Sequence, residues 1–162
     1  IHEACTCVNK VDVRAKLTEL GLELPVAAKP VAAYVPAIRT GNLVFTAGQL
    51  PLAGGEMAGV GKVDGEITPE RAKELAQICA LNCLAAVETV ADVNKITKIV
   101  RVVGYVNGVA GFIGHPGVVN GASELFIAIW GDGAKHARSA VGIAELPLNS
   151  PVEIELTVEI TD

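Results

Sequence analysis

Hydrophobic and polar positions alternate most regularly near the end of the chain, in residues 152–160. The apolar set is Val152, Ile154, Leu156, Val158 and Ile160, and the intervening polar set is Glu153, Glu155, Thr157 and Glu159. A period of two is typical of a β-strand with one face in the core and the other outside it. The segment therefore predicts a sheet with one apolar and one polar face.

A second segment with period two, residues 136–147, places one arginine among small side chains. One face of this strand takes Ser139, Val141 and Ile143, and the other takes Arg138, Ala140, Gly142 and Ala144. The side chains next to Arg138 on this face are too small to cover its guanidinium group. We therefore expect a helix, another subunit or a cleft to lie beside its guanidinium group.

Two longer segments carry the repeat of an amphipathic helix. The first begins at Thr68-Pro69-Glu70, which supplies an N-cap hydroxyl, a proline at the first helical position and an acid in the first turn, and it runs to about Val90. The second runs from about Pro116 to Trp130 and is followed by glycine. A shorter leading helix is predicted in residues 10–20, ending at Gly21.

The remaining segments predict strands and an extended connector. Residues 35–39 and 43–47 predict a hairpin, the β-branched segment 95–107 predicts a strand, and a short strand is expected around Lys62-Val63. The resulting order, β-β-(β)-α-β-α-β-β, favours an α+β fold in which two main helices pack on one face of a mixed sheet. We assign residues 1–33 to the leading helix and connector, and 34–162 to the domain proper.

Composition narrows the class of protein. With 162 residues, 51% of them hydrophobic and only 4% aromatic, the chain is expected to form one domain whose core is mainly Val, Ile, Leu and Ala. A net charge of −5 and the lack of a Lys/Arg cluster argue against nucleic acid as a partner. The sequence has no apolar run of about 18 residues and no signal-peptide pattern, so we expect a cytoplasmic protein without a membrane partner.

Cysteines and histidines give no metal or disulfide signature. The spacings of Cys5 with Cys7 and of Cys79 with Cys83 match neither common zinc sites nor easy disulfide geometry, and the second pair is expected to be buried. No metal site is expected from the scattered histidines. His115 is predicted to cap a helix, and His136 either lines the same cleft as Arg138 or lies at a solvated strand end.

Arg138 is the strongest candidate for a binding residue. A guanidinium group can hold a carboxylate through two parallel hydrogen bonds, so a small carboxylate ligand would suit it. Glu153, on the polar face of the last strand, could act as a general base or pair with Arg138. The residue pattern alone favours the structural ion pair.

Three segments resemble the Rid family, also called YjgF, of reactive-intermediate deaminases. They are N-L-V-F-x-A-G-Q-x-P at 42–51, A-R-S-A-V at 137–141, and L-P-x-x-x-x-V-E-I-E at 146–155, and the resemblance covers about residues 34–160. It implies a chorismate-mutase-like α+β fold, assembled as a homotrimer with three clefts between subunits.

The resemblance also implies an activity. Characterised members hydrolyse 2-imino or enamine acids to 2-keto acids and ammonia without a cofactor or metal. Arg138 matches the carboxylate-binding arginine of the family, and Tyr34, Gly48, Asn120 and Glu153 match its other cleft residues. Glu153 is then expected to orient or activate the attacking water.

The chain departs from the family pattern at one position of the strand. Many deaminating members have a cysteine two residues after the arginine, where this chain has Ala140. The leading helix and residues 114–142 also resemble a less characterised branch with a longer N-terminus. Two alternatives therefore stand beside deamination: a non-catalytic trimer that binds small carboxylates and, less favoured because of the acidic charge, an endoribonuclease.

Overall fold

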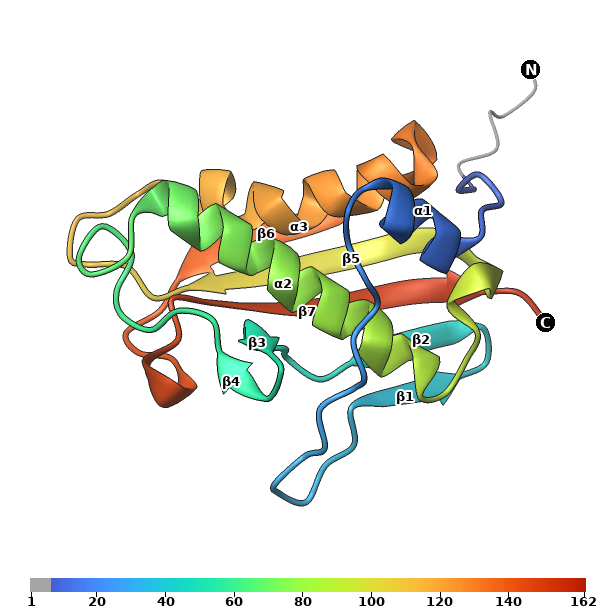
Figure 1. Ribbon diagram of the computed structural model, residues 1–162, viewed down its shortest axis with the longest axis horizontal. Helices are drawn as coiled ribbons and strands as arrows, with labels where there is room; N and C mark the ends of the chain where they lie inside the picture. The colour runs from blue at the N-terminus through green and yellow to red at the C-terminus, as the bar shows by residue number, and fades with distance from the viewer. Residues whose placement is uncertain (1–6) are drawn as a thin grey trace.

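The computed structural model describes residues 7–162 (Figure 1). In chain order the elements are α1 (Val13–Glu19), β1 (Ala37–Thr40), β2 (Leu43–Thr46), β3 (Leu52–Ala53), β4 (Glu56–Met57), α2 (Pro69–Glu88), η1 (Val93–Lys95), β5 (Ile96–Val106), α3 (His115–Trp130), η2 (Asp132–Ala134), β6 (Ala137–Gly142), η3 (Pro147–Asn149) and β7 (Val152–Ile160). The expected α+β class with a mixed sheet is confirmed. Cys5 lies outside the described residues.

Five strands form the main sheet in the order β1-β2-β7-β5-β6. The pair β5–β6 is parallel, and the other three pairs are antiparallel. The predicted hairpin is present as β1 and β2, with Gly41 in the turn at a φ of 57°. Strand β6 lies at one edge of this sheet, so one side of its backbone has no neighbouring strand in the main sheet.

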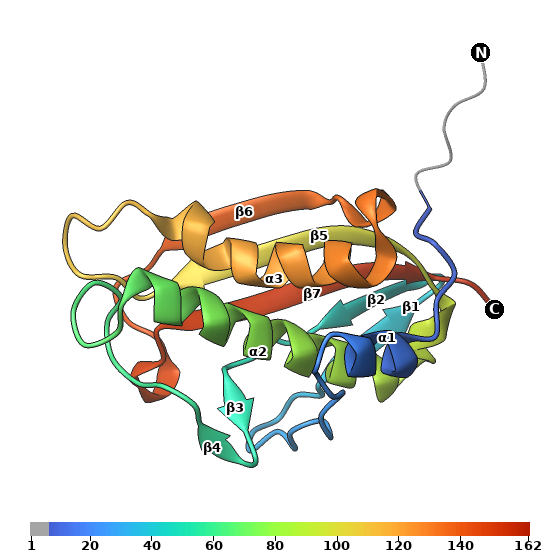
Figure 2. The ribbon, with the colours of Figure 1, turned by 45° about the horizontal axis from the view of Figure 1, so that its top comes forward.

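Helices α2 and α3 lie on one face of the sheet (Figure 2). The apolar side chains of β7 point toward these helices and are buried, whereas the alternating polar side chains face the other way and are half-buried. The core is built mainly from Val, Leu, Ile and Ala. The predicted arrangement, two main helices over one apolar face, is therefore confirmed.

Two glycines allow α3 to approach its neighbours closely. A Cβ atom at Gly104 of β5 would clash with the side chain of Val119, and one at Gly121 of α3 would clash with the backbone carbonyl of Lys73 in α2. Both positions need a residue without a side chain, because neither the buried Val119 side chain nor the Lys73 backbone can move aside cheaply. These contacts fix where α3 lies above β5 and β6.

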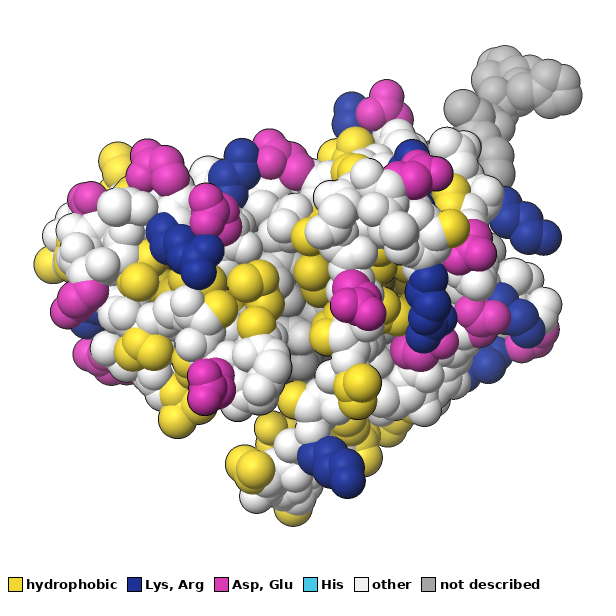
Figure 3. Space-filling view, in the orientation of Figure 1, with side chains coloured by type: hydrophobic (Ala, Val, Ile, Leu, Met, Phe, Trp, Pro, Cys, Tyr) yellow, Lys and Arg dark blue, Asp and Glu magenta, His cyan; other side chains and the backbone are white. Residues whose placement is uncertain are grey.

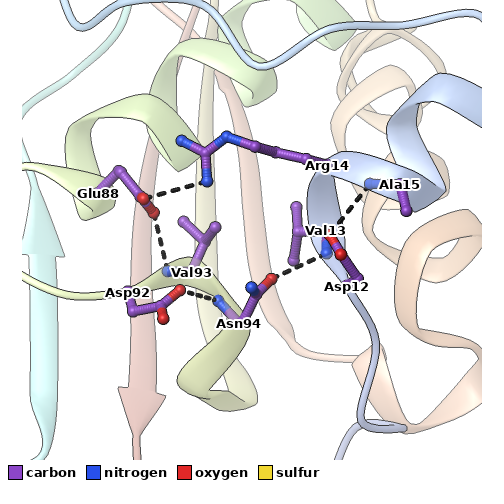
Figure 4. Close-up of polar contacts among 8 residues, drawn as sticks. All are labelled: Asp12, Val13, Arg14, Ala15, Glu88, Asp92, Val93 and Asn94. Carbon is purple, nitrogen blue, oxygen red and sulfur yellow. Dashed lines mark hydrogen bonds and ion pairs between the residues drawn. The ribbon is translucent and has the colours of Figure 1, made fainter.

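The short helix α1 is tied to the end of α2 by a polar network (Figure 4). Asp12 caps α1 by accepting a hydrogen bond from the backbone nitrogen of Ala15, and the backbone nitrogen of Val13 donates to Asn94 Oδ1 at 2.9 Å. Glu88 accepts from Arg14 at 3.2 Å and from the backbone nitrogen of Val93 at 2.9 Å. The leading helix is thereby fixed against the body of the domain.

Two local predictions are wrong. No strand forms at Lys62-Val63, because backbone at positive φ on both sides, at Gly61 and Asp64, turns the chain, and Val63 makes only isolated bridges. A two-stranded ladder, β3–β4, forms nearby instead. His115 does not cap α3: the N-cap is Gly114, no side chain caps it, and the His115 ring contacts Phe112 edge-on.

The cysteines of α2 are buried, as predicted. Their thiol groups point to the backbone of β7, where Cys83 Sγ lies 3.3 Å from the carbonyl oxygen of Ile154. Burial raises the pKa of Cys83 to about 12 and moves the pKa of Cys79 well above its ordinary value. Both are therefore neutral, small hydrophobic side chains at physiological pH. Within residues 7–162, no helix has the length and hydropathy needed to cross a membrane.

Candidate functional site

Arg138 lies on β6 with its side chain on the helical face of the sheet. Its partner in the parallel ladder is Val102, which is fully buried under the helices. The guanidinium reaches α3, where Nη1 donates to Asn120 Oδ1 at 2.7 Å and to Ser123 Oγ at 3.2 Å. Of the three neighbours expected from the sequence, α3 is therefore the element beside Arg138.

The other edge of the guanidinium has no protein partner within residues 7–162. Both hydrogen bonds of its side chain use Nη1, and Arg138 forms no ion pair in this part of the chain. The side chain lines an open depression of about 290 Å³ together with Asn120, Ser123, Ile127, Lys135 and His136. This lining holds two cations and no acidic residue, which suits an anionic ligand.

His136 belongs to the same depression, although the strand begins only after it. Its Nε2 lies 2.8 Å from Ser123 Oγ, and its Nδ1 lies 2.8 Å from the carbonyl oxygen of Ala134. Of the two interpretations left open by the sequence, the cleft-lining one is confirmed and the solvated strand end is wrong. We call Asn120, Ser123, His136 and Arg138 the arginine site.

Glu153 lies on the opposite face of the sheet. It pairs with Tyr105 of β5, between the buried residues Val152 and Ile154 of its own strand. The expected ion pair with Arg138 is therefore wrong, because the sheet separates the two side chains. Burial raises the pKa of Glu153 above its ordinary value, and repulsion from Glu155 raises it further.

Gly48 lies directly against Glu153. A Cβ atom at this position would be 2.8 Å from both Cδ and Oε1 of Glu153, so only glycine leaves room for the carboxylate. The backbone bridge between Gln49 and Ile154 holds the two segments together, with N–O distances of 2.8 and 3.1 Å. Gly48 thus lets the Glu153 carboxylate lie close to the backbone of the same chain.

Tyr34 ends the extended connector and is 55% exposed. It lines a second depression, of about 220 Å³, together with Gly48, Gln49 and Leu148. We call Tyr34, Gly48 and Glu153 the glutamate site. The five residues singled out in the sequence thus fall into two groups within one chain: Arg138 with Asn120, and Glu153 with Gly48 and Tyr34.

Ser123 is the residue of the arginine site that was not identified from the sequence. It is 8% exposed and lies three residues after Asn120, on the same side of α3. The i,i+3 spacing of Asn120 and Ser123 in a mostly apolar helix was the available signal. No group of three His, Cys, Asp or Glu side chains within residues 7–162 could hold a metal ion.

Comparison with known protein families defines the class of protein. The sequence profile of the family described as "YjgF/chorismate mutase-like, putative endoribonuclease" matches residues 14–160. The chain therefore belongs to the YjgF family, and the resemblance found in its three motifs is confirmed.

Individual relatives cover nearly the whole chain. Protein TCP17 of Trypanosoma cruzi is 33% identical over 93% of this chain and 95% of its own. A 2-iminobutanoate/2-iminopropanoate deaminase of Dermatophagoides farinae is 30% identical over 86% of this chain and 94% of its own. The crystal structure of Atu1372, a protein of unknown function from Agrobacterium tumefaciens, superposes with a TM-score of 0.85 at 40% identity, over 92% and 93% of the two chains.

Proposed function

We propose that this protein is an imine deaminase, which hydrolyses small 2-imino acids or their enamine tautomers to 2-keto acids and ammonia. One observation carries the proposal: Arg138 is held by α3 through Nη1 alone and lines a depression that contains cations but no carboxylate. The remaining Nε and Nη2 have the spacing of the two oxygens of a carboxylate. Every 2-imino acid carries a carboxylate beside the reacting carbon.

The reaction needs few groups from the protein. Water adds to the carbon of R–C(=NH2+)–COO−, and the tetrahedral adduct expels ammonia to give R–CO–COO− and NH4+. The protonated imine is already electrophilic, so holding its carboxylate and placing a water molecule beside the carbon supplies the required proximity. Glu153 would take the proton from the water, and its raised pKa makes it a stronger base than an ordinary carboxylate.

The two sites must come together for this chemistry. Arg138 and Glu153 lie on opposite faces of the sheet, so the arginine site of one subunit would have to meet the glutamate site of another. A closed homotrimer, the assembly expected from the family resemblance, repeats such a head-to-tail contact three times. The relative named as an imino acid deaminase supports this activity.

A coupled assay tests the proposal. An amino-acid oxidase generates the imino acid, semicarbazide traps it, and the protein competes by converting it to the keto acid. We expect diversion by the wild type and a loss of about a hundredfold or more in Arg138→Ala. Arg71→Ala, which removes an exposed arginine of α2 paired with Glu74, is the matched control and should retain activity. If the wild type diverts none of a panel of 2-imino acids, the proposal is wrong.

A second function, binding of a small carboxylate without turnover, has its own supporting observation. The arginine site is complete within one chain, whereas Glu153 lies away from it. Stabilisation by pyruvate that persists in Glu153→Gln, with no turnover by the wild type, would favour this function over deamination.

Ribonuclease activity, which the family description mentions, is less favoured. The net charge is −5, and on the helical face basic side chains are interspersed with acidic ones (Figure 3). Binding to RNA depends on releasing counterions from phosphates, which a continuous basic surface does best. An RNA affinity that falls steeply with salt concentration would favour ribonuclease activity over deamination.

A further inference from the structure

We infer that Ser123 and His136 are positioning residues that act in series on Arg138: His136 orients the hydroxyl group of Ser123, and this hydroxyl group holds the guanidinium for a ligand carboxylate. The inference rests on the proposed function, because it concerns the same arginine. It adds two residues that are not among the five matched to the family pattern.

The direction of the hydrogen bonds follows from His136. Its Nδ1 lies 2.8 Å from the carbonyl oxygen of Ala134, which can only accept, so Nδ1 carries the proton of the neutral ring. Nε2 is then an acceptor, and the group 2.8 Å from it is Ser123 Oγ. The hydroxyl proton of Ser123 is therefore directed at His136.

Arg138 occupies the other side of the Ser123 oxygen. Because the Ser123 hydroxyl group donates its hydrogen bond to His136, the lone pairs of Oγ are available to accept from Arg138 Nη1 at 3.2 Å. The second proton of Nη1 goes to Asn120 Oδ1 at 2.7 Å. Because both protons of Nη1 are used, the guanidinium plane is fixed by α3, and the Nε–Nη2 edge keeps its donors for a ligand.

The surroundings keep His136 neutral. Burial lowers its pKa, the hydrogen bond to Ala134 opposes this in part, and repulsion from Arg138 lowers it again. Lys135 is the other cation that lines the depression. The Phe126 ring of α3 packs edge-on against the His136 ring, with 6.2 Å between the ring centroids. A protonated His136 could not accept from Ser123, so the neutral ring is the form that holds the serine in this direction.

Affinity for pyruvate, measured by calorimetry at neutral pH, tests the series. Ser123→Ala and His136→Phe should each weaken binding by about tenfold or more, the loss typical of one hydrogen bond to a charged group. Because the two residues act through one hydroxyl group, the double variant should bind no more weakly than Ser123→Ala. His136→Gln, whose side-chain oxygen can accept near the position of Nε2, should recover most of the affinity.

The controls separate positioning from folding. Ser139→Ala removes a hydroxyl group from the other face of β6, where it accepts from Arg101, and should leave pyruvate affinity unchanged. Ser123→Ala adds no volume, so the test stands on this variant even if His136→Phe does not fold. In the coupled assay, with the substrate concentration varied, both variants should raise KM more than they lower kcat, since they act on carboxylate binding.

The possible failures are distinguishable. If Arg138→Ala binds pyruvate like the wild type, the proposed function is wrong. If Arg138→Ala abolishes binding but Ser123→Ala does not weaken it, or if the two losses multiply in the double variant, the series from His136 to Arg138 is wrong, whereas the carboxylate-binding role of Arg138 that the proposed function needs is retained.

Discussion

The surroundings of Glu153 disfavour the charged form of its carboxyl group. Burial and the neighbouring Glu155 both raise its pKa, so the folded protein binds this proton more tightly than the unfolded chain. The charged form therefore costs stability at neutral pH, and the cost disappears as the pH falls below the ordinary carboxyl value. Such a cost is common where a side chain is kept for chemistry.

Glu153→Gln should accordingly stabilise the protein. We expect the melting temperature to rise by about 2–4 °C at pH 7, with the gain shrinking toward zero near pH 4 because protonated Glu153 carries no penalty. Scanning calorimetry at several pH values measures this difference. Glu56→Gln on the exposed strand β4 is the control. A gain that is constant with pH, or a loss at pH 7, would contradict the prediction.

Gly48→Ala should impair activity more than folding. The added methyl group would meet the Glu153 carboxyl at 2.8 Å, but the carboxyl is the end of a flexible side chain and can turn away. We expect turnover to fall about tenfold or more, because the proposed base, Glu153, is displaced, with a stability change below about 1 kcal/mol. Wild-type turnover in the coupled assay would show that the position of this carboxylate is unimportant.

At the scale of the elements, helix α3 supplies Asn120 and Ser123 of the arginine site, and its position depends on its crossing with α2 at Gly121. A methyl group there would clash with the Lys73 carbonyl of α2, and neither backbone can yield cheaply. The residues on either side of this crossing, Asn120 and Ser123, hold Arg138. Packing between the helices and orientation of the arginine are thus coupled.

Gly121→Ala should destabilise the protein by about 2 kcal/mol or more and weaken pyruvate binding. Gly117→Ala, one turn earlier in the same helix and with open space around it, should instead stabilise by about 0.5–1 kcal/mol through helix propensity. Denaturant titration of both variants makes the comparison. Equal effects of the two substitutions would show that the crossing does not constrain α3.

Elements with strong periodic patterns could be predicted from the sequence, and elements without them could not. The alternation of residues 152–160 was sufficient to predict β7, and the N-cap signal at Thr68 was sufficient to predict the start of α2. In the structure, the Thr68 side chain accepts a hydrogen bond from the backbone nitrogen of Arg71. Strands β3 and β4 have two residues each, too few to show any period. The pattern also could not show that Arg138 and Glu153 lie on opposite faces of the sheet. Val141 is the single bulky apolar residue of β6, so the alternation of this strand defines two faces without indicating which one the helices cover.

For the whole molecule, the separation of the two sites makes a prediction about mixed assemblies. Arg138→Ala and Glu153→Gln should each be inactive, but subunits of the two variants, unfolded and refolded together, should regain about one quarter of wild-type activity. That fraction follows if each cleft takes its arginine and its glutamate from different chains at random. Activity no higher than that of the separate variants would place both residues of a functional site in one chain.

The position of Arg138 and Glu153 on opposite faces also has a consequence for the free subunit. A lone chain would keep the arginine site, which can bind an anion, but would have no proposed base, Glu153, beside it. If the proposed trimer forms, specific activity should then decline on dilution as its subunits separate, while pyruvate still protects each subunit against heat. Turnover per chain would thus report how much of the protein is associated.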